Sequence, residues 1–201
     1  MTPNLLKYLC DPTDQSDLDL VNPLFDEYGD IVSGQLISLN GNRYQIKNGI
    51  PRFSGNDEMS QSVDSFGNEW NHFNFDDFKL NWLNHTVKNT FGSVDAFKNK
   101  LVVDCGAGSG MQTRWISEAG ASHVIALELS HSVDGVIKEN LKDIHNVDVI
   151  QCSIDAPPLK RNSIDGIVIC HNVIQHTPSV ESTAKALWDL VSIGGEFVFK
   201  C

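Results

Sequence analysis

The stretch VVDCGAGSG at residues 102–110 decides the fold of this 201-residue chain. A short apolar run ends in the acidic Asp104, and glycines follow at the alternate positions Gly106, Gly108 and Gly110. Glycines in this pattern allow a tight turn from a strand into a helix and let a ligand approach the main chain closely. We therefore predict a ligand-binding turn at the end of a strand.

The turn departs from the fingerprint of dinucleotide-binding proteins. The pattern GxGxxG, counted from Gly106, requires glycine at position 111, where the chain has Met111. A nicotinamide-dependent oxidoreductase is therefore a weaker hypothesis than a protein that binds another nucleotide-like ligand.

Short apolar runs alternate with amphipathic segments from Lys100 onward. The runs cover residues 101–104, 123–129, 147–152, 165–170 and 196–200, and the helical segments cover about 111–119, 133–140 and 180–191. This alternation predicts an α/β fold, a Rossmann-like doubly wound and mostly parallel sheet. Ligands of such sheets bind at the carboxyl ends of the strands.

The earlier part of the chain divides into two segments of different character. Residues 1–55 predict a small β-rich module with a hairpin around Asn40–Asn42, whereas the acidic stretch 11–30 predicts a solvated loop. Residues 56–99 predict an aromatic-rich helical linker or cap, in which Phe78 and Trp82 share one helix face. The core domain is then 100–201.

The net charge and the cysteine positions argue against several classes of partner and site. With 15 basic and 26 acidic residues the net charge is −11, which disfavours nucleic acid and anionic membranes as partners. No apolar run is long enough to span a bilayer and no signal peptide is recognisable, so we expect a cytoplasmic protein. The five cysteines form no CxxC pair, so we expect no metal.

The second apolar run, HVIALEL, ends at Glu128 and Leu129, eighteen and nineteen positions after Gly110. A carboxylate there can accept hydrogen bonds from both hydroxyls of a ribose. An adenosine-type ligand across the strand ends is the reading that this spacing favours.

These motifs together resemble the class I methyltransferases that use S-adenosylmethionine. The likeness rests on VVDCGAGSG, on Glu128, and on three later segments in family order: QCSIDAPPL (151–159), IDGIVICHNVIQHTPS (164–179) and SIGGEFVFK (192–200). It implies S-adenosyl-L-methionine as cofactor and says little about the methyl acceptor.

The resemblance also assigns roles to residues. Asp104 would orient the amino-acid end of the cofactor through the turn, and Glu128 would hold the ribose. His176 is a candidate general base for an acceptor that must lose a proton. The remaining candidates for cofactor binding are Gly106, Ala107, Gly108 and Gly110 in the turn, Leu129, Ser153 and Ile154 around the adenine, and Cys170 and His171 at the methionine portion. Ser153 stands where many members have aspartate, and Asp155 is the alternative for that contact.

The N-terminal module is similar to a small zinc-ribbon-like domain of a methyltransferase-activating protein. Cys10 is kept, but the other ligand positions hold Thr13, Ser38 and Gly41, so we expect the module to fold without metal. The segment 62–70 resembles a stretch that precedes the methyltransferase core in enzymes of polysaccharide and natural-product clusters. For its Phe66 and Trp70, we favour core packing over a role in covering the cofactor.

The expected function is transfer of a methyl group to a small-molecule or sugar-containing (glycan-type) acceptor. The alternative is a catalytically silent methyltransferase-like module that binds a protein partner. The family fold continues for two strands past the position of Cys201, so we expect either a fragment of a longer protein or a shortened member, and we favour the fragment. The open edge of the sheet is a candidate for homo-oligomer contacts.

Overall fold

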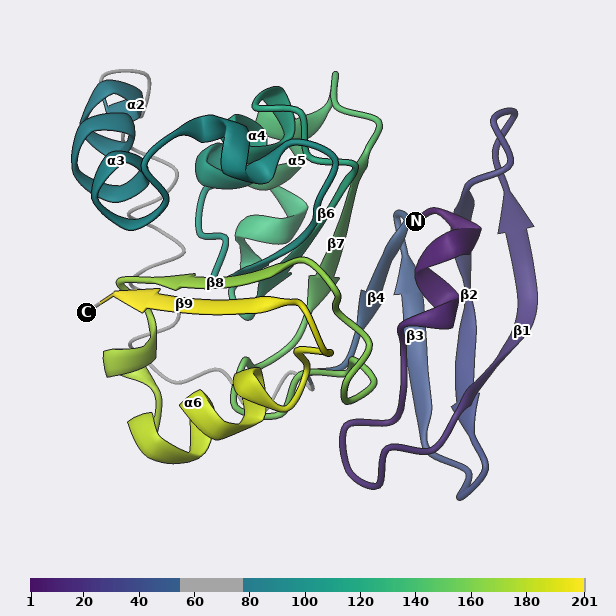
Figure 1. Ribbon diagram of the computed structural model, residues 1–201. Coiled ribbons are helices and arrows are strands. Elements are labelled where there is room, and N and C mark those ends of the chain that lie inside the picture. Colours follow the sequence, from purple (N-terminus) through teal and green to yellow (C-terminus); the bar gives the residue numbers. More distant parts are fainter. Residues whose placement is uncertain (55–77, 201) are drawn as a thin grey trace.

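The computed structural model describes residues 1–54 and 78–200, which contain one nine-stranded sheet. Figure 1 shows helices on both faces of this sheet. The strand order is β1-β2-β3-β4-β7-β6-β5-β8-β9. Strands β1 to β4 form the N-terminal module and strands β5 to β9 form the core. The predicted α/β fold is confirmed.

The N-terminal module is an antiparallel meander packed on a short 3₁₀ helix, η1 (Pro3–Lys7). Its strands are β1 (Leu18–Phe25), β2 (Ile31–Ser38), β3 (Arg43–Lys47) and β4 (Ile50–Arg52). The hairpin predicted around Asn40–Asn42 joins β2 to β3.

The prediction of a solvated loop over the acidic stretch is wrong for residues 18–25, which form β1 and pair with β2. Leu18 and Leu20 pack against the hydrophobic core while Asp19 between them is exposed. This alternation is the pattern of a strand with one buried face, and the high acidic content of the stretch obscured it.

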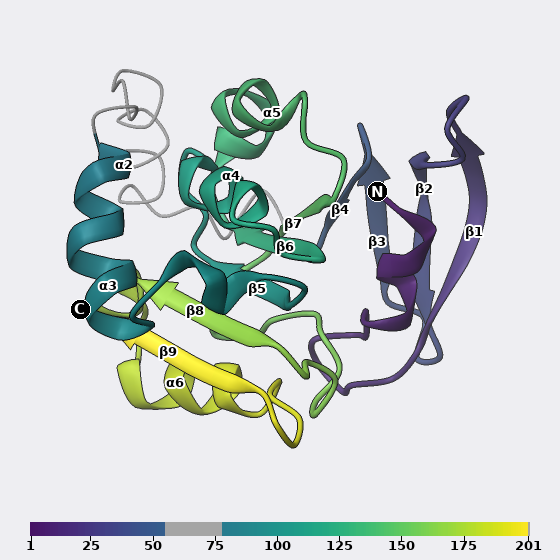
Figure 2. The ribbon, with the colours of Figure 1, turned by 45° about the horizontal axis from the view of Figure 1, so that its top comes forward.

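The core has the predicted parallel arrangement. Strands β5 (Leu101–Cys105), β6 (His123–Glu128), β7 (Val147–Gln151), β8 (Ile167–His171) and β9 (Glu196–Lys200) all run in the same direction. Helices α4 (Met111–Glu118) and α5 (Val136–Leu141) cover one face of the sheet, and α6 (Val180–Trp188) covers the other (Figure 2). The strand ends of β5, β6 and β8 are therefore neighbours.

A helical segment precedes the core. It runs through α2 (Phe78–Asn81), the π-helical η3 (Trp82–Val87) and α3 (Lys88–Thr90), and a 3₁₀ turn, η4 (Val94–Phe97), follows. Trp82 is buried, with its ring centroid 5.5 Å from that of Trp115, whereas Phe78 is half exposed. None of the helices in the described ranges is both long and apolar enough to cross a bilayer.

The module and the core share one sheet and one hydrophobic cluster. Strand β4 pairs in parallel with β7, where Arg52 stands opposite Gln151 and the Phe53 amide donates to the Gln151 carbonyl at 2.8 Å. Leu9 of the module also forms an isolated antiparallel β-bridge with Leu159 of the core. The buried cluster takes members from both parts: Leu5, Leu9, Leu36 and Ile46 from the module, and Val103, Ile125, Leu127 and Val168 from the core.

Candidate functional site

The register of the core strands brings the predicted site residues to one edge of the sheet. Cys105, at the end of β5, stands opposite Leu127 of β6 on one side and Cys170 of β8 on the other. The glycine turn, Glu128 and the pair Cys170–His171 are therefore adjacent. This is the edge at which ligands of parallel sheets bind.

The turn after β5 requires its glycines. Gly106, Gly108 and Gly110 have φ values of +79°, +59° and +79°, a region that other residues rarely adopt. The Gly106 amide donates to the Leu127 carbonyl at 2.8 Å. A Cβ atom added at Gly106 would lie 2.5 Å from Cγ2 of Val173, which belongs to the loop after β8.

Asp104 lies inside the protein and fixes the first turn of α4. Its Oδ1 accepts a hydrogen bond from Gln112 Nε2 at 2.7 Å and its Oδ2 accepts one from Thr113 Oγ1 at 2.6 Å. Burial raises the pKa of the Asp104 carboxyl; the hydrogen bonds from Thr113 and Gln112 oppose that rise, and the negative charge of Glu128 adds to it. The buried Asp104 side chain therefore holds the start of α4, and with it the glycine turn, in place.

Gln112 connects Asp104 to the helical segment before the core. Its Oε1 accepts from Trp82 Nε1 at 3.1 Å and lies 3.2 Å from Nδ1 of His171. Since Oε1 can only accept, Nδ1 of His171 carries the proton and Nε2 accepts from the hydroxyl of Thr86 at 3.2 Å. Burial and the charge of Lys200 both lower the pKa of His171, which favours the neutral form of the imidazole.

Trp82 and Thr86 both belong to the π-helical turn, a feature frequent at functional sites. Sequence reasoning missed the roles of Gln112, Thr86 and Trp82, although the position of Gln112 two residues after Gly110 was a signal.

Glu128 is 7% exposed at the end of β6. Its Oε2 accepts from the Gly108 amide at 2.8 Å and its Oε1 accepts from the Ser130 amide at 2.7 Å. A carboxylate oxygen can accept two hydrogen bonds, so each oxygen keeps capacity for one more. A fixed carboxylate with free acceptor capacity beside a glycine turn fits the ribose of an adenosine-type cofactor.

The loop after Glu128 is held by Gln151, which sequence reasoning also missed. Gln151 Nε2 donates to the Leu129 carbonyl at 3.1 Å, and its Oε1 accepts from Arg52 Nη1 at 2.7 Å. Arg52 in turn forms an ion pair with Asp134, with 2.7 Å between Nη2 and Oδ1. A side chain of the N-terminal module thus reaches the edge that carries Glu128.

The structure places the remaining candidates at the same end of the sheet with different exposure. The Cys152 amide donates to the Glu128 carbonyl at 3.0 Å, which brings the following Ser153 and Ile154 next to that residue. Ile154 is buried and Ser153 is half-buried. His176 ends the short 3₁₀ helix η6 (Ile174–His176), and its side chain is exposed. Phe66 and Trp70 lie outside the described residues.

Hydrogen bonds occupy the place where the zinc-ribbon-like motif would have its ligands. The buried Asp11 accepts from the Thr13 amide at 2.8 Å, from the Thr13 hydroxyl at 2.6 Å and from Asn42 Nδ2 at 2.8 Å. Within residues 1–54 and 78–200, no three His, Cys, Asp or Glu side chains come together as a metal site would require.

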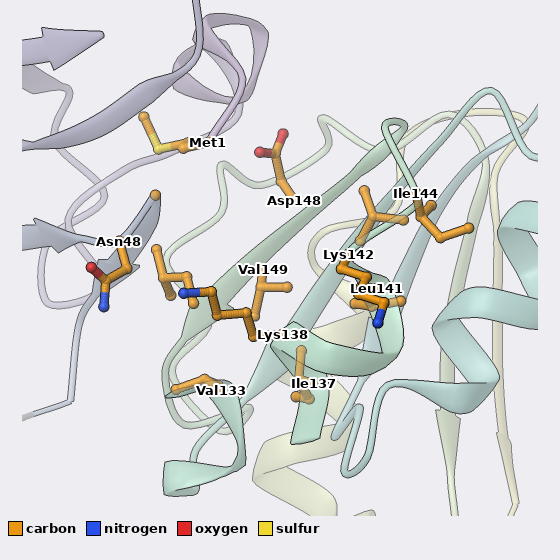
Figure 3. A pocket seen from close by; sticks show the side chains of 13 residues that line it. Met1, Asn48, Val133, Ile137, Lys138, Leu141, Lys142, Ile144, Asp148 and Val149 are labelled. Atoms are coloured by element: carbon orange, nitrogen blue, oxygen red, sulfur yellow. The ribbon is translucent and has the colours of Figure 1, made fainter. Parts of the chain in front are cut away.

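A cavity of about 190 Å³ lies at the seam between the module and α5 (Figure 3). Its floor is apolar, and Asn48, Lys138, Lys142 and Asp148 stand among the residues at its walls. None of the predicted cofactor residues lines it, so it is separate from the edge described above.

Residues 103–199 match the model of the family described as "Methyltransferase domain". The matched segment, just under half of the chain, is therefore similar to a methyltransferase domain.

Among curated proteins, the chain is 28% identical over 122 residues to the ubiquinone biosynthesis O-methyltransferase of Aromatoleum aromaticum, covering 60% of this chain and 48% of that protein. It is also 33% identical over 88 residues to protein arginine N-methyltransferase 1 of Oryza sativa subsp. indica, covering 40% of this chain and 21% of that protein. The chain spans about half the length, or less, of these relatives.

Two solved structures show the same fold. One is a Methanococcus maripaludis protein described as an S-adenosyl-L-methionine-dependent methyltransferase, with a TM-score of 0.55, 15% identity, and coverage of 72% of this chain and 67% of that one. The other belongs to the complex between the Haloferax volcanii Trm112 methyltransferase activator and a methyltransferase, with a TM-score of 0.54, 18% identity, and coverage of 68% and 59%.

Proposed function

We propose that this chain carries the cofactor-binding part of an S-adenosylmethionine-dependent methyltransferase whose acceptor is a small molecule or a sugar-containing compound. The observation that carries the proposal is the Glu128 carboxylate, which two backbone amides hold beside the glycine turn. The O-methyltransferase relatives support a small-molecule acceptor.

In this proposal the ligand lies across the ends of β5, β6 and β8. Glu128 accepts hydrogen bonds from the ribose hydroxyls, and the main chain of Gly106, Ala107, Gly108 and Gly110 passes beneath the amino-acid end. Leu129, Ser153 and Ile154 surround the adenine, and Cys170 and His171 flank the methionine portion. When bound, S-adenosylmethionine supplies a methyl group on a sulfonium, an electrophile that needs no further activation.

The protein then has to hold the acceptor in line with that methyl group, since displacement at carbon depends on a near-attack geometry. His176 is the proposed general base. Its exposed imidazole follows the β8 loop at the ligand edge and would take the proton of an acceptor hydroxyl. An acceptor that is already ionised would not need this step.

Calorimetric titration tests the proposal. The chain is titrated with S-adenosylmethionine and with S-adenosylhomocysteine, and NAD serves as the control ligand. We expect saturable binding of the first two only. Glu128→Gln should weaken binding by about tenfold or more because a neutral amide is a poorer partner for two hydroxyls, and Glu139→Gln on the exposed face of α5 is the matched control.

Absence of binding by the wild-type chain would contradict the proposal. That outcome would favour the alternative, a methyltransferase-like module that acts through a protein partner, for which the fold shared with the Trm112 activator complex is the supporting observation.

A further inference from the structure

Arg52 is the side chain that links the N-terminal module to the proposed adenosine side of the site. It ends β4, and its guanidinium grips Asp134 with two nitrogens, at 2.7 Å from Nη2 to Oδ1 and 3.3 Å from Nη1 to Oδ2. The same Nη1 donates to Gln151 Oε1 at 2.7 Å. Its side chain is only 10% exposed, against 42% for that of Asp134.

The two partners of Arg52 hold the two ends of one loop. This loop starts at Glu128 and ends with the 3₁₀ helix η5 (His131–Asp134). Near its start, Gln151 donates to the carbonyl oxygens of Leu129 and Ser130. At its other end, Asp134 is the residue that Arg52 grips.

The loop geometry in turn fixes the carboxylate. The Ser130 amide donates to Glu128 Oε1 at 2.7 Å, so a shift of the Leu129–Ser130 backbone would rotate that carboxylate or leave one of its oxygens without this donor. The path from Arg52 to Glu128 consists of Gln151 and one stretch of main chain.

A contribution to the stability of the fold does not by itself explain why Arg52 is held by Asp134 and Gln151. A buried guanidinium paired with a carboxylate contributes little net stability, because desolvation offsets the attraction. In addition, Arg52 Nε is buried without a hydrogen-bond partner in the described part of the chain. What the guanidinium supplies is its planar fork, which can hold a carboxylate and an amide oxygen at fixed angles.

We propose that Arg52 is a positioning residue through which the N-terminal module sets the geometry of the loop that binds the adenosine half of the cofactor. The inference rests on the proposed function, since it takes Glu128 and Leu129 as contacts of ribose and adenine. It adds a specific task for the module in cofactor binding.

The test measures dissociation constants for two ligands in the full chain. S-adenosylhomocysteine engages the whole cofactor site, and 5′-methylthioadenosine lacks the amino-acid end and so reports the adenosine half alone. The variants are Arg52→Gln, Arg52→Lys and Asp134→Asn. Arg43→Gln, which removes an exposed arginine from β3 of the same module, is the control. Thermal unfolding without ligand is recorded for each.

We expect Arg52→Gln to weaken both ligands by the same factor, about tenfold, as loss of a charged hydrogen bond that orders a binding loop would do. Arg52→Lys should recover part of this loss, because an ammonium can reach one acceptor but cannot form the fork. Asp134→Asn, which changes an exposed side chain and leaves Gln151 in place, should weaken binding less, and Arg43→Gln should leave it unchanged.

Equal affinity of the folded wild-type, Arg52→Gln and Asp134→Asn proteins for 5′-methylthioadenosine would overturn the inference, even if the Arg52 variant unfolds at a lower temperature. Should Arg52→Gln fail to fold, the comparison of Asp134→Asn with wild type decides. If the wild-type chain binds neither ligand, the proposed function fails as well, so the two failures are distinguishable.

Discussion

The side-chain amide of Gln112 satisfies polar groups on three other elements: the Asp104 carboxylate on β5, the Trp82 indole in the π-helical turn and the His171 imidazole on β8. Gln112→Met keeps the length of the side chain and removes all three hydrogen bonds. We expect the free energy of unfolding to fall by about 1–3 kcal/mol, because the buried Asp104 loses one of its two donors. Urea denaturation measures the change, and Gln45→Met on the exposed face of β3 is the control. Equal losses in both variants would contradict the role of Gln112.

The hydrogen-bonded carboxyl of Asp11 should make the stability of the protein depend on pH. Burial alone would raise the pKa of its carboxyl, but hydrogen bonds from Thr13 and Asn42 outweigh burial and hold the pKa well below its usual range. A carboxyl whose pKa is lower in the folded state stabilises the fold above its unfolded pKa of about 4 and loses this contribution as the pH falls. Asp11→Asn should therefore be less stable than wild type at pH 7, and the difference should shrink toward pH 2 to 3.

Urea titrations of both proteins at several pH values check this. A difference that stays constant from pH 7 to pH 3 would show that the Asp11 carboxylate does not titrate as its hydrogen bonds require. The position could not be predicted from the sequence, because the zinc-ribbon resemblance draws attention to Cys10 and Thr13 and passes over the acid between them.

At the scale of elements, the turn between β5 and α4 packs against the loop after β8. Gly106→Ala would place a methyl group 2.5 Å from Val173 Cγ2 at a φ of +79°. We expect a loss of about 1–3 kcal/mol in the free energy of unfolding from strain and overpacking.

The double variant Gly106→Ala with Val173→Ala separates the two causes. It should recover the part of the loss that is due to the clash and keep the part that is due to the backbone, so the two substitutions should be non-additive in a double-mutant cycle. Strictly additive losses would show that the two loops do not meet.

The elements of the core were predictable because each has a regular period. The five apolar runs after Lys100 became β5 to β9, and the three amphipathic segments became α4, α5 and α6. Strand β1 was missed because seven acidic residues in 11–30 outweighed the alternation of Leu18, Asp19 and Leu20. The π-helical turn has no sequence period of its own and depends on tertiary contacts of Trp82 and Thr86.

At the scale of the whole molecule, the module and the core should unfold together, since they share a sheet and a buried cluster. Leu9→Ala removes a side chain that is 1% exposed and belongs to the module. We expect a loss of about 2–5 kcal/mol in a single transition. Residues 1–54 contain no tryptophan, and Trp82 and Trp115 are buried together in a cluster outside the module, so tryptophan fluorescence follows unfolding outside the module.

Fluorescence and far-ultraviolet circular dichroism should therefore give coincident transitions in Leu9→Ala. Leu39→Ala, at a side chain that is 90% exposed, is the control and should change stability by less than about 0.5 kcal/mol. A core transition that does not move in Leu9→Ala would show that the two parts fold independently.

The long-range contacts of the site are the part that the sequence alone could not supply. Asp104, the glycines and Glu128 were identified because they follow strand ends at recognisable spacing. The Arg52 and Gln151 side chains meet across a separation of 99 residues, and only the parallel pairing of β4 with β7 brings them together. No local pattern encodes that pairing.

Cys105 and Cys152 follow from the same architecture. Both thiols lie buried at the ends of strands beside the proposed ligand, and burial raises their pKa well above the usual range. Alkylating reagents attack the thiolate, so at neutral pH these side chains react only when this edge of the sheet opens. The rate at which these two thiols are alkylated therefore measures how often this edge opens, and mass spectrometry can follow it without an engineered probe. A ligand that binds at this edge should slow the labelling.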